Sequence, residues 1–504
     1  MTSRSTMFAL LFAASVSTPS AIAAETQPAV GRYRIAYATF IGGSQFDQLR
    51  EIIRLPDGSV LVGGQTSSPD LPITEGVVQP TYGGEPAGAG HPGVSGGDCF
   101  VACLDPQGRH FAFVTYFGGS RQERAVYGMA LDKRGNIIIA TGCRSHDLPT
   151  TDRAYQRRYG GGKADVMLAK LAPDARSTIW CTYIGGRGND WPRGGIALDQ
   201  EDNVVIVGRS DSPDFPGTDG VLRLKVSGAE GDAMVVKMRA GGTGLVWATL
   251  LGGSNWDGLM GARVDAAGNV YVAGHTRSTD LPVTPSAAQP TAGGESDCSL
   301  ASLSPDGRRL RYCTYLAGSG NEFAEHRPAL LGDGSVLLTG VTASANFPTT
   351  DNAYQKQLKG KTDGFVAKVS PDGTKFAFCT LLGGSGGEFF LMPTVGADGN
   401  ICIVGHTDSR DFPVTPDALQ KTYGGGKGDA VLAILSSDGS KLLYATYLGG
   451  SGDDLIRSVT LGENGTLYLA GNSNSDDFPI SAHAAQRTHR GNHDGVIVKL
   501  EPAK

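Results

Sequence analysis

Charge is scarce in this sequence. Charged residues make up 19% of the 504 positions, and the formal net charge is only −6, whereas soluble domains usually carry about a quarter of charged residues. No run of basic residues occurs, which argues against nucleic acid and anionic membrane surfaces as partners. No segment has the length and the 3.6-residue period of a substantial helix. At most one short helix is expected, around residues 351–358.

Cysteine pairs at metal-binding spacing are also absent. None of the eight cysteines forms a CxxC motif or the Cys/His spacing of a zinc site. Several occupy positions that hold Ala or Val in other parts of the chain, which favours buried free thiols. The alternative for one pair is a disulfide: Cys298 and Cys313 flank the turn at 304–308, and they can bond if their Cα atoms oppose each other within about 4.4–6.8 Å.

Long apolar runs are missing after residue 24. The first 24 residues contain Arg4, an apolar core at 7–16 and small residues at 21–23, which is the pattern of a secretory signal peptide. The core is too short to cross the roughly 30 Å apolar layer of a membrane. Residues 1–24 are therefore expected to be a signal peptide and residues 25–33 a short linker. The mature chain is expected to be secreted, periplasmic or associated with the cell surface, without a transmembrane segment.

Glycine and repetition are abundant. Glycine takes 73 of 504 positions, about twice the usual 7%. A segment of the type "TYLGGS" occurs seven times, starting at residues 39, 115, 182, 249, 314, 380 and 446. The copies lie 76, 67, 67, 65, 66 and 66 residues apart. A period this regular indicates an array of equal structural units.

Each unit is predicted to supply four antiparallel strands, A to D. Alternating apolar runs are separated by short turns rich in Gly, Asn and Asp, such as 304–308 and 396–400. A longer segment separates strands B and C. Four-stranded units repeated seven times predict an all-β fold, a seven-bladed β-propeller over residues 34–504.

The two ends of the array complement each other. It opens with a D strand at about 34–40 and ends with a C strand at about 494–500. The N-terminal D strand is expected to complete the last blade by pairing with the C strand. Closing the ring in this way removes the sheet edges that an open array exposes.

Four motifs resemble a known family. They are "TYLGGS" followed by an acidic residue, "GNVYVAG" at 268–274, the tripeptide "DFP", and "DGVIVKL" at 494–500. Together they resemble the SBBP repeat of bacterial and archaeal seven-bladed β-propellers, over about residues 34–502. The resemblance implies a propeller in an exported or cell-surface protein. It implies no reaction, because the family has no agreed catalytic motif.

An acidic residue follows every "GGS" segment and begins strand A. Its presence in all seven units favours a structural role, in which the carboxylate accepts backbone N–H bonds in its own loop. The alternative is a metal site, since carboxylates and loop carbonyls suit Ca²⁺; no other cofactor is expected. The seven residues are Asp47, Glu123, Asp190, Asp257, Glu322, Glu388 and Asp454.

Ligand-binding candidates are expected around the mouth of the central channel, because strand A is the innermost strand. Arg50, Arg193 and Arg457 stand three positions after the acidic residue. Arginine suits anionic ligands, but these residues can instead pair with the acid at i−3 or on a neighbouring blade. The residue that ends strand B varies between units, as an asymmetric site requires, although an unconstrained surface position would vary in the same way. Candidates at this position are Gln65, Arg209, His275, His406 and Asn472.

The sequence therefore predicts an exported, non-catalytic binding or interaction scaffold. It would use the loop face, where the D–A and B–C connections lie, to bind a protein or carbohydrate ligand, and is expected to be a monomer. The alternative is a propeller hydrolase or lyase at the loop-face mouth of the channel. A compact His/acid/Arg cluster at one mouth would favour the enzyme, and a broad apolar or aromatic surface would favour binding.

Overall fold

The computed structural model describes residues 33–85, 97–223 and 230–503. The expected signal peptide and, apart from Tyr33, the expected linker lie outside the described residues. No helix in the described part of the chain is long and apolar enough to cross a membrane.

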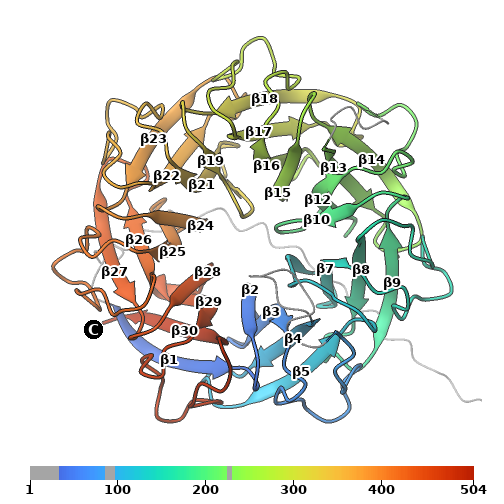
Figure 1. Cartoon of the computed structure of the whole chain (residues 1–504), viewed down its shortest axis with the longest axis horizontal. Coiled ribbons are helices and arrows are strands. Elements are labelled where there is room, and N and C mark those ends of the chain that lie inside the picture. Colours follow the sequence, from blue (N-terminus) through green and yellow to red (C-terminus); the bar gives the residue numbers. More distant parts are fainter. Residues whose placement is uncertain (1–32, 86–96, 224–229, 504) are drawn as a thin grey trace, which may run out of the picture.

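Seven antiparallel sheets surround a central axis, each with its first strand innermost (Figure 1). The fold predicted from the sequence is confirmed. Blades one to three consist of β2 (Asp47–Arg54), β3 (Val60–Thr66), β4 (Asp98–Leu104) and β5 (Phe111–Phe117); β6 (Gly128–Leu131), β7 (Ile137–Cys143), β8 (Asp165–Leu171) and β9 (Thr178–Ile184); β10 (Asp190–Pro192), β11 (Ala197–Leu198), β12 (Val204–Ser210), β13 (Asp232–Met238) and β14 (Leu245–Leu251).

Blades four to seven follow the same order. They consist of β15 (Asp257–Val264), β16 (Val270–Thr276), β17 (Asp297–Leu303) and β18 (Leu310–Leu316); β19 (Glu322–Phe323), β20 (Ala329–Leu330), β21 (Val336–Thr342), β22 (Asp363–Val369) and β23 (Phe376–Leu382); β24 (Glu388–Val395), β25 (Ile401–Thr407), β26 (Asp429–Leu435) and β27 (Leu442–Leu448); β28 (Asp454–Leu461), β29 (Leu467–Ser473), β30 (Asp494–Pro502) and β1 (Tyr33–Ile41).

The ring closes through the two ends of the chain. Strand β1 pairs antiparallel with β30, with Arg34 opposite Glu501 and Phe40 opposite Val496. Phe40 and Val496 are buried in the core cluster between blades six and seven. The predicted closure of blade seven by the N-terminal strand is therefore confirmed.

The cysteines lie in the cores between blades. All eight are buried and free, so the disulfide between Cys298 and Cys313 is not formed. In the strand ladder Cys298 lies opposite Leu316 and Cys313 opposite Ala301. The two thiols also face opposite sides of blade four, because Cys298 packs in the core towards blade five and Cys313 in the core towards blade three.

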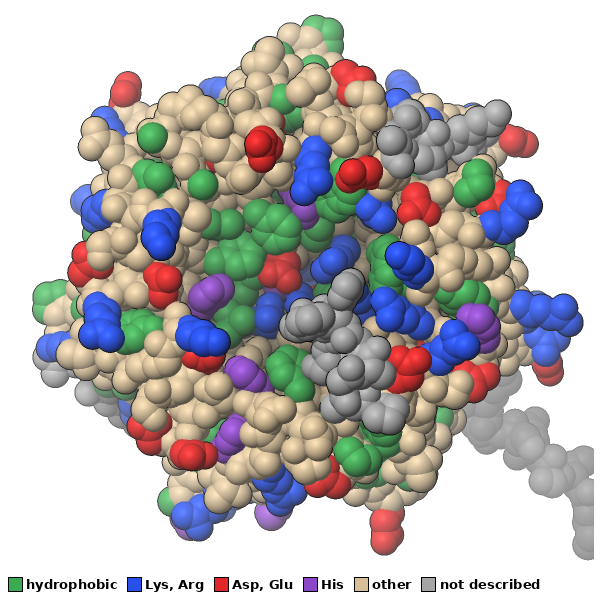
Figure 2. Space-filling view, in the orientation of Figure 1, with side chains coloured by type: hydrophobic (Ala, Val, Ile, Leu, Met, Phe, Trp, Pro, Cys, Tyr) green, Lys and Arg blue, Asp and Glu red, His purple; other side chains and the backbone are tan. Residues whose placement is uncertain are grey.

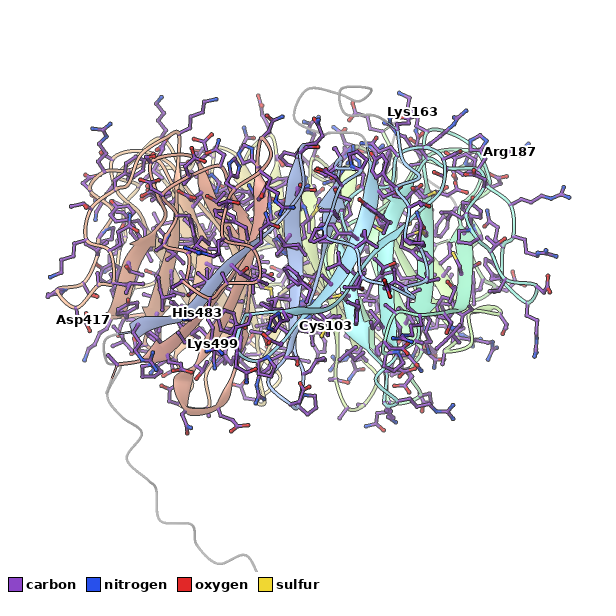
Figure 3. The ribbon with its side chains drawn as sticks, turned by 90° about the horizontal axis from the view of Figure 1, so that it is seen from below. Cys103, Lys163, Arg187, Asp417, His483 and Lys499 are labelled. Atoms are coloured by element: carbon purple, nitrogen blue, oxygen red, sulfur yellow. The ribbon has the colours of Figure 1, made fainter. Side chains whose placement is uncertain are left out.

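The sequence predicts that the long B–C segments lie on the loop face, but they do not cover it. They run down the outer edge of the molecule, where Thr415 N–H bonds to the Ala445 carbonyl of strand β27 (3.0 Å) (Figure 3). Their lower parts form hydrogen bonds with the C–D turn of the next blade. For example, the Ala288 N–H donates to the Gly373 carbonyl (2.8 Å). They thus cover the outer sheet edges and join neighbouring blades. The short helix expected at 351–358 is absent; this segment forms turns and one bridge to β23.

The innermost strands are all irregular: those of blades one, four, six and seven carry a bulge, and those of blades two, three and five are shortened or split. In blades one, four and seven the ladder skips a single residue: Arg50, Met260 and Arg457. Blades two, three and five have one residue more between the acidic residue and the A–B turn, nine instead of eight. Here strand A is shortened or split. Bulges re-aim side chains, so the residues lining the channel come from these irregular segments.

We expect deletion of residues 33–41 to lower the melting temperature and to cause self-association, because it exposes the edge of β30. Thermal melts and size-exclusion chromatography measure both effects. Deletion of residues 25–32, which keeps β1, is the matched control. A melting temperature and an elution volume equal to those of the control would contradict closure by β1.

Candidate functional site

The acidic residue that begins each strand A is buried and holds its own loop together. Asp257 accepts the N–H of Gly253 (2.8 Å) and the hydroxyl of Ser278 (2.9 Å), which lies beyond the end of strand B. In every blade the equivalent Gly N–H reaches the carboxylate at 2.8–3.0 Å. These bonds fix the D–A connection to the end of strand B.

The "DFP" position works in the same manner. Asp70 accepts the N–H of Ser44 at 2.8 Å, and in blade five the amide oxygen of Asn346 accepts the N–H of Ser319 at the same distance. An amide thus replaces the carboxylate without loss of the bond, so this position needs an acceptor rather than a charge. Among the described residues, no three His, Cys, Asp or Glu side chains gather as metal ligands.

Glu123 and Asp98 form a close pair of buried acids in blades two and one. Burial raises the pKa of Glu123 to about 8, and the nearby Asp98 adds to this rise. Burial likewise raises the pKa of Asp98 to about 6. Both carboxyls therefore hold protons in the folded protein over a pH range in which the unfolded chain has released them.

Three charged side chains meet across the channel. Glu325 of blade five bonds to Arg50 of blade one (2.7 Å) and faces Arg457 of blade seven (3.8 Å). Burial alone would raise the pKa of Glu325, but the two guanidinium groups outweigh it and hold this pKa well below its usual range. Burial and the adjacent Arg50 lower the pKa of Arg457 to about 10. Arg50 and Arg457 thus pair with an acid on a distant blade, not with the acid three positions before them.

A second ion pair lies deeper. Glu51 of blade one, fully buried, bonds to Arg327 of blade five at 2.9 Å. The backbone of Arg327 packs against Gly261 of blade four so closely that a Cβ on this glycine would lie 2.2 Å from the Arg327 Cα. The bulge of blade five therefore crosses to blades one and four and fills the centre of the ring.

Three arginines at the mouth have no acidic partner among the described residues. Arg124 and Arg144 of blade two lie over the ring of Trp191 in blade three, with guanidinium carbons 4.4 and 5.8 Å from its centroid. Arg193 lies over the ring of Tyr127 (5.3 Å). Of the ion pairs between described residues, none involves Arg124, Arg144 or Arg193. All three side chains are half-buried. They are named the arginine cluster below.

The phenol of Tyr127 lies among these arginines. Burial opposes its ionisation, but Arg193, Arg50 and Arg124 outweigh burial and lower the pKa of Tyr127 to about 8. The Tyr127 hydroxyl lies 3.5 Å from an Arg193 nitrogen. Part of the phenol is thus ionised near neutral pH.

The other half of the mouth is aromatic. Ring contacts join Trp256 to His275 (4.5 Å between centroids), His275 to Phe323 (4.2 Å), Phe323 to Phe389 (5.6 Å) and Phe389 to His406 (6.0 Å). This aromatic arc spans blades four to six. Burial is the main reason that the pKa values of His275 and His406 fall, to about 3 and about 4. Both imidazoles are thus neutral at pH 7, and two phenylalanine rings separate them.

The central hollow of the loop face shows this division (Figure 2). Green apolar side chains gather on one side of the hollow and blue basic ones on the other, with a red acidic side chain between them. The mouth is therefore asymmetric, although the scaffold around it repeats seven times.

The remaining sequence candidates are placed around the same mouth. Arg209 lies opposite Trp191 in the sheet and stacks on Trp256 (5.9 Å). The side-chain oxygen of Gln65 accepts a hydrogen bond from the side-chain amide of Gln48 (3.0 Å). Asn472 lines a cavity of about 220 Å³ between blades six and seven, together with His406, Lys427, Gly428, Asp453, Asp454, Leu455 and His493.

Sequence reasoning missed several residues of this mouth. Arg124, Trp191, Phe323 and Phe389 directly follow the acidic residue, and Glu325 lies three positions after it. The signal was available: the position after the acid reads Gln, Arg, Trp, Gly, Phe, Phe and Leu along the seven blades. Because the acidic residue recurs in every blade while the residue after it varies, that second position is not required by the scaffold and can differ at a binding site.

We expect Asp257→Ala to lower the free energy of unfolding by about 1.5–3 kcal/mol, because bonds from buried donors to a charged group are lost. Thermal melts of both proteins, with calcium and with a chelator, measure this loss. The same loss in both conditions supports the structural role. If the chelator lowers the melting temperature of the unmutated protein to that of the variant, the carboxylates hold a metal.

A pH dependence follows from the buried pair Glu123 and Asp98. Their pKa values are higher in the folded than in the unfolded state, so the folded state binds more protons between about pH 4 and 8 and stability falls as the pH rises. We expect Glu123→Gln to flatten this fall in melts at pH 5 and pH 8, and exposed Glu201→Gln to leave it unchanged. An equal slope in both variants would contradict the assignment.

Comparison with known proteins gives weak likenesses only. No curated protein matches the sequence. Three solved structures resemble it over most of its length: a protein of unknown function from Dyadobacter fermentans DSM 18053 (10% identity, TM-score 0.41, 94% of this chain and 99% of that chain), BamB from Moraxella catarrhalis (14%, 0.37, 91% and 99%), and the quinohemoprotein alcohol dehydrogenase ADHIIG from Pseudomonas putida HK5 (12%, 0.42, 96% and 78%). Likenesses this weak carry no information on function.

A family model agrees with the repeat. Residues 443–479 match the SBBP model, described as a beta-propeller repeat. This segment runs from strand D of blade six through strands A and B of blade seven, and the other blades have the same order of elements. This match and the seven observed blades support the resemblance to the seven-bladed β-propeller repeat family that the sequence motifs carry.

Proposed function

We propose that this protein is an exported binding module that takes an anionic ligand at the loop-face mouth of its channel. The observation that carries the proposal is the arginine cluster, Arg124, Arg144 and Arg193, which has no acidic partner among the described residues. The cluster occupies positions where the blades differ, so it is not part of the repeated scaffold.

The electrostatics of the mouth support an anion. The buried Nε–H groups of Arg124 and Arg144 have no hydrogen-bond partner among the described residues. Burial, together with the charges of Arg193 and Arg144, lowers the pKa of Arg124. Half-buried charges without partners are costly, and a carboxylate or sulfate would relieve this cost through two-pronged hydrogen bonds.

The neighbouring charges provide an internal comparison. Arg50 and Arg457 share Glu325, and Arg209 has Asp211 at 3.5 Å. Within the described residues, three arginines of the mouth thus have an acidic partner and the three of the cluster have none. The ligand is inferred to supply the missing negative charge.

A lyase is the second candidate, and Tyr127 is the observation that favours it. A phenol whose pKa is about 8 can act as a base near neutral pH. Adjacent arginines can neutralise a carboxylate whose α-carbon loses a proton. The criterion set from the sequence for an enzyme was a compact His/acid/Arg cluster, whereas this cluster has Tyr127 in place of a histidine; the aromatic arc favours binding. We rank binding first because Tyr127 is only 8% exposed.

We expect the purified protein to be retained on dextran sulfate and not on neutral dextran at about 0.15 M ionic strength, where long-range attraction is screened. Its net charge of −6 opposes such retention unless a local cationic site binds. Replacing Arg124 and Arg144 by Gln should weaken binding about 10- to 100-fold or more, since each charged hydrogen bond contributes about 1.5–3 kcal/mol.

Arg187→Gln is the matched control for this experiment. Arg187 lies at the periphery of the loop face, where it pairs with Asp214 (2.9 Å) and is 78% exposed (Figure 3). We expect its replacement to leave retention unchanged. Equal retention of the double variant and the unmutated protein would contradict a site at the mouth.

A further inference from the structure

We propose that the anionic ligand is an acidic oligosaccharide, with a uronic acid carboxylate at the arginine cluster, sugar rings along the aromatic arc and one sugar in the cavity between blades six and seven. The inference rests on the binding function proposed above and names the chemical class of its ligand.

The aromatic arc favours a chain of rings over a small anion. Trp256, Phe323 and Phe389 are only partly buried although they are large and apolar. They lie in an unbroken series of ring contacts from Trp256 to His406, and Arg209 extends the series to blade three. The C–H groups on the face of a sugar carry partial positive charge and pack on the negative face of aromatic rings. A free phosphate or carboxylate would leave this surface unused.

The arc leads directly to the cavity. His406 makes the last ring contact of the arc and also lines the cavity. Leu455 of the same cavity occupies the position after the acid in blade seven, which corresponds to Phe389 in blade six. The arc and the cavity therefore adjoin at His406.

The cavity has polar groups that a sugar would satisfy. Asn472 is 7% exposed, and its Oδ1 has no hydrogen-bond partner among the described residues; neither has the Nδ1 of His406. Buried acceptors of this kind require donors, and sugar hydroxyls are donors. The volume of about 220 Å³ is below the range of about 300–1,000 Å³ for drug-sized ligands, so the cavity suits one ring.

The arginine cluster holds the carboxylate end of the oligosaccharide in this proposal. Trp191 lies between Arg124 and Arg144 on one side and, opposite it in the sheet, Arg209 on the other. Arg209 stacks on Trp256, the first ring of the arc. The cationic and aromatic halves of the mouth are thus continuous, and a single chain with a carboxylate and several sugar rings can contact both.

Calorimetric titration of the mature protein tests the inference. The probes are oligogalacturonate, oligomannuronate and hyaluronan oligosaccharides, with the methyl ester of oligogalacturonate as the neutral form and poly-glutamate as the acidic peptide. We expect at least one of the three acidic saccharides to bind, the ester to bind at least tenfold more weakly than its acid, and poly-glutamate to bind weakly or not at all.

Variants separate the two halves of the mouth. Phe323→Ala with Phe389→Ala should weaken binding of the uronate saccharides at least tenfold, whereas any remaining retention on dextran sulfate should still depend on Arg124 and Arg144. Asn472→Leu should also weaken saccharide binding, since it fills the cavity and removes the acceptor. Ile179→Ala, at an exposed apolar residue of the outer strand β9, is the matched control. Circular dichroism confirms that each variant is folded.

Each outcome has a defined meaning. If none of the three uronate saccharides binds, or if the phenylalanine variant binds them equally well, the inference is wrong. The proposed function survives if dextran sulfate is still retained through Arg124 and Arg144, and fails if it is not. Poly-glutamate that binds as tightly, with the same dependence on the phenylalanines, identifies a peptide site and overturns the saccharide. Formation of a C4–C5 double bond in the uronate can be followed by its ultraviolet absorbance. If it forms and is lost in Tyr127→Phe, the saccharide inference is supported, but the protein is a lyase rather than a binding module.

Discussion

Closure of the ring by the pairing of β1 with β30 is the constraint on which the rest of the molecule depends. Because β1 supplies the outer strand of blade seven, the seven sheets form one circle and their innermost strands face a common channel. The B–C segments then cover the outer sheet edges, and six of them bond to the C–D turn of the next blade. Blade six lacks such a partner, because blade seven has chain ends in place of a C–D turn; the Tyr33 and Tyr444 rings meet at this junction instead, 5.1 Å apart.

A closed ring of equal blades creates a channel that equal residues cannot fill. Bulges at the third position after the acid solve this problem, and the extra residue in blades two, three and five lets those segments reach further inwards. Glu325 in the bulge of blade five meets Arg50 and Arg457, so blades one, five and seven are linked through the centre. The residues that repeat therefore form the blades around the channel, and the residues that differ between blades line its mouth. This explains why the mouth is chemically asymmetric on a sevenfold scaffold.

The fold was predictable because it depends on local signals that recur: turn residues, alternating strands and complementary ends. The site was predictable only in part. Arg50, Arg193 and Arg457 follow from the spacing after the acid, but the partner of Arg50 and Arg457 is a residue of another blade, which spacing alone does not reveal. The disulfide between Cys298 and Cys313 was wrong because Cys298 lies opposite Leu316, three residues from Cys313, and the two thiols face different sides of the sheet. The B–C segments were misplaced because their length, but not their path down the outer edge, is visible in the sequence.

The central claim is that the ligand binds where the blades differ, at the loop-face mouth. A crystal structure of the protein soaked with an acidic oligosaccharide tests it most directly. The account predicts a ligand carboxylate within hydrogen-bond distance of Arg124 or Arg144, with a sugar ring over Phe323 or Phe389. A ligand bound instead on the opposite face, among the A–B and C–D turns, would contradict it.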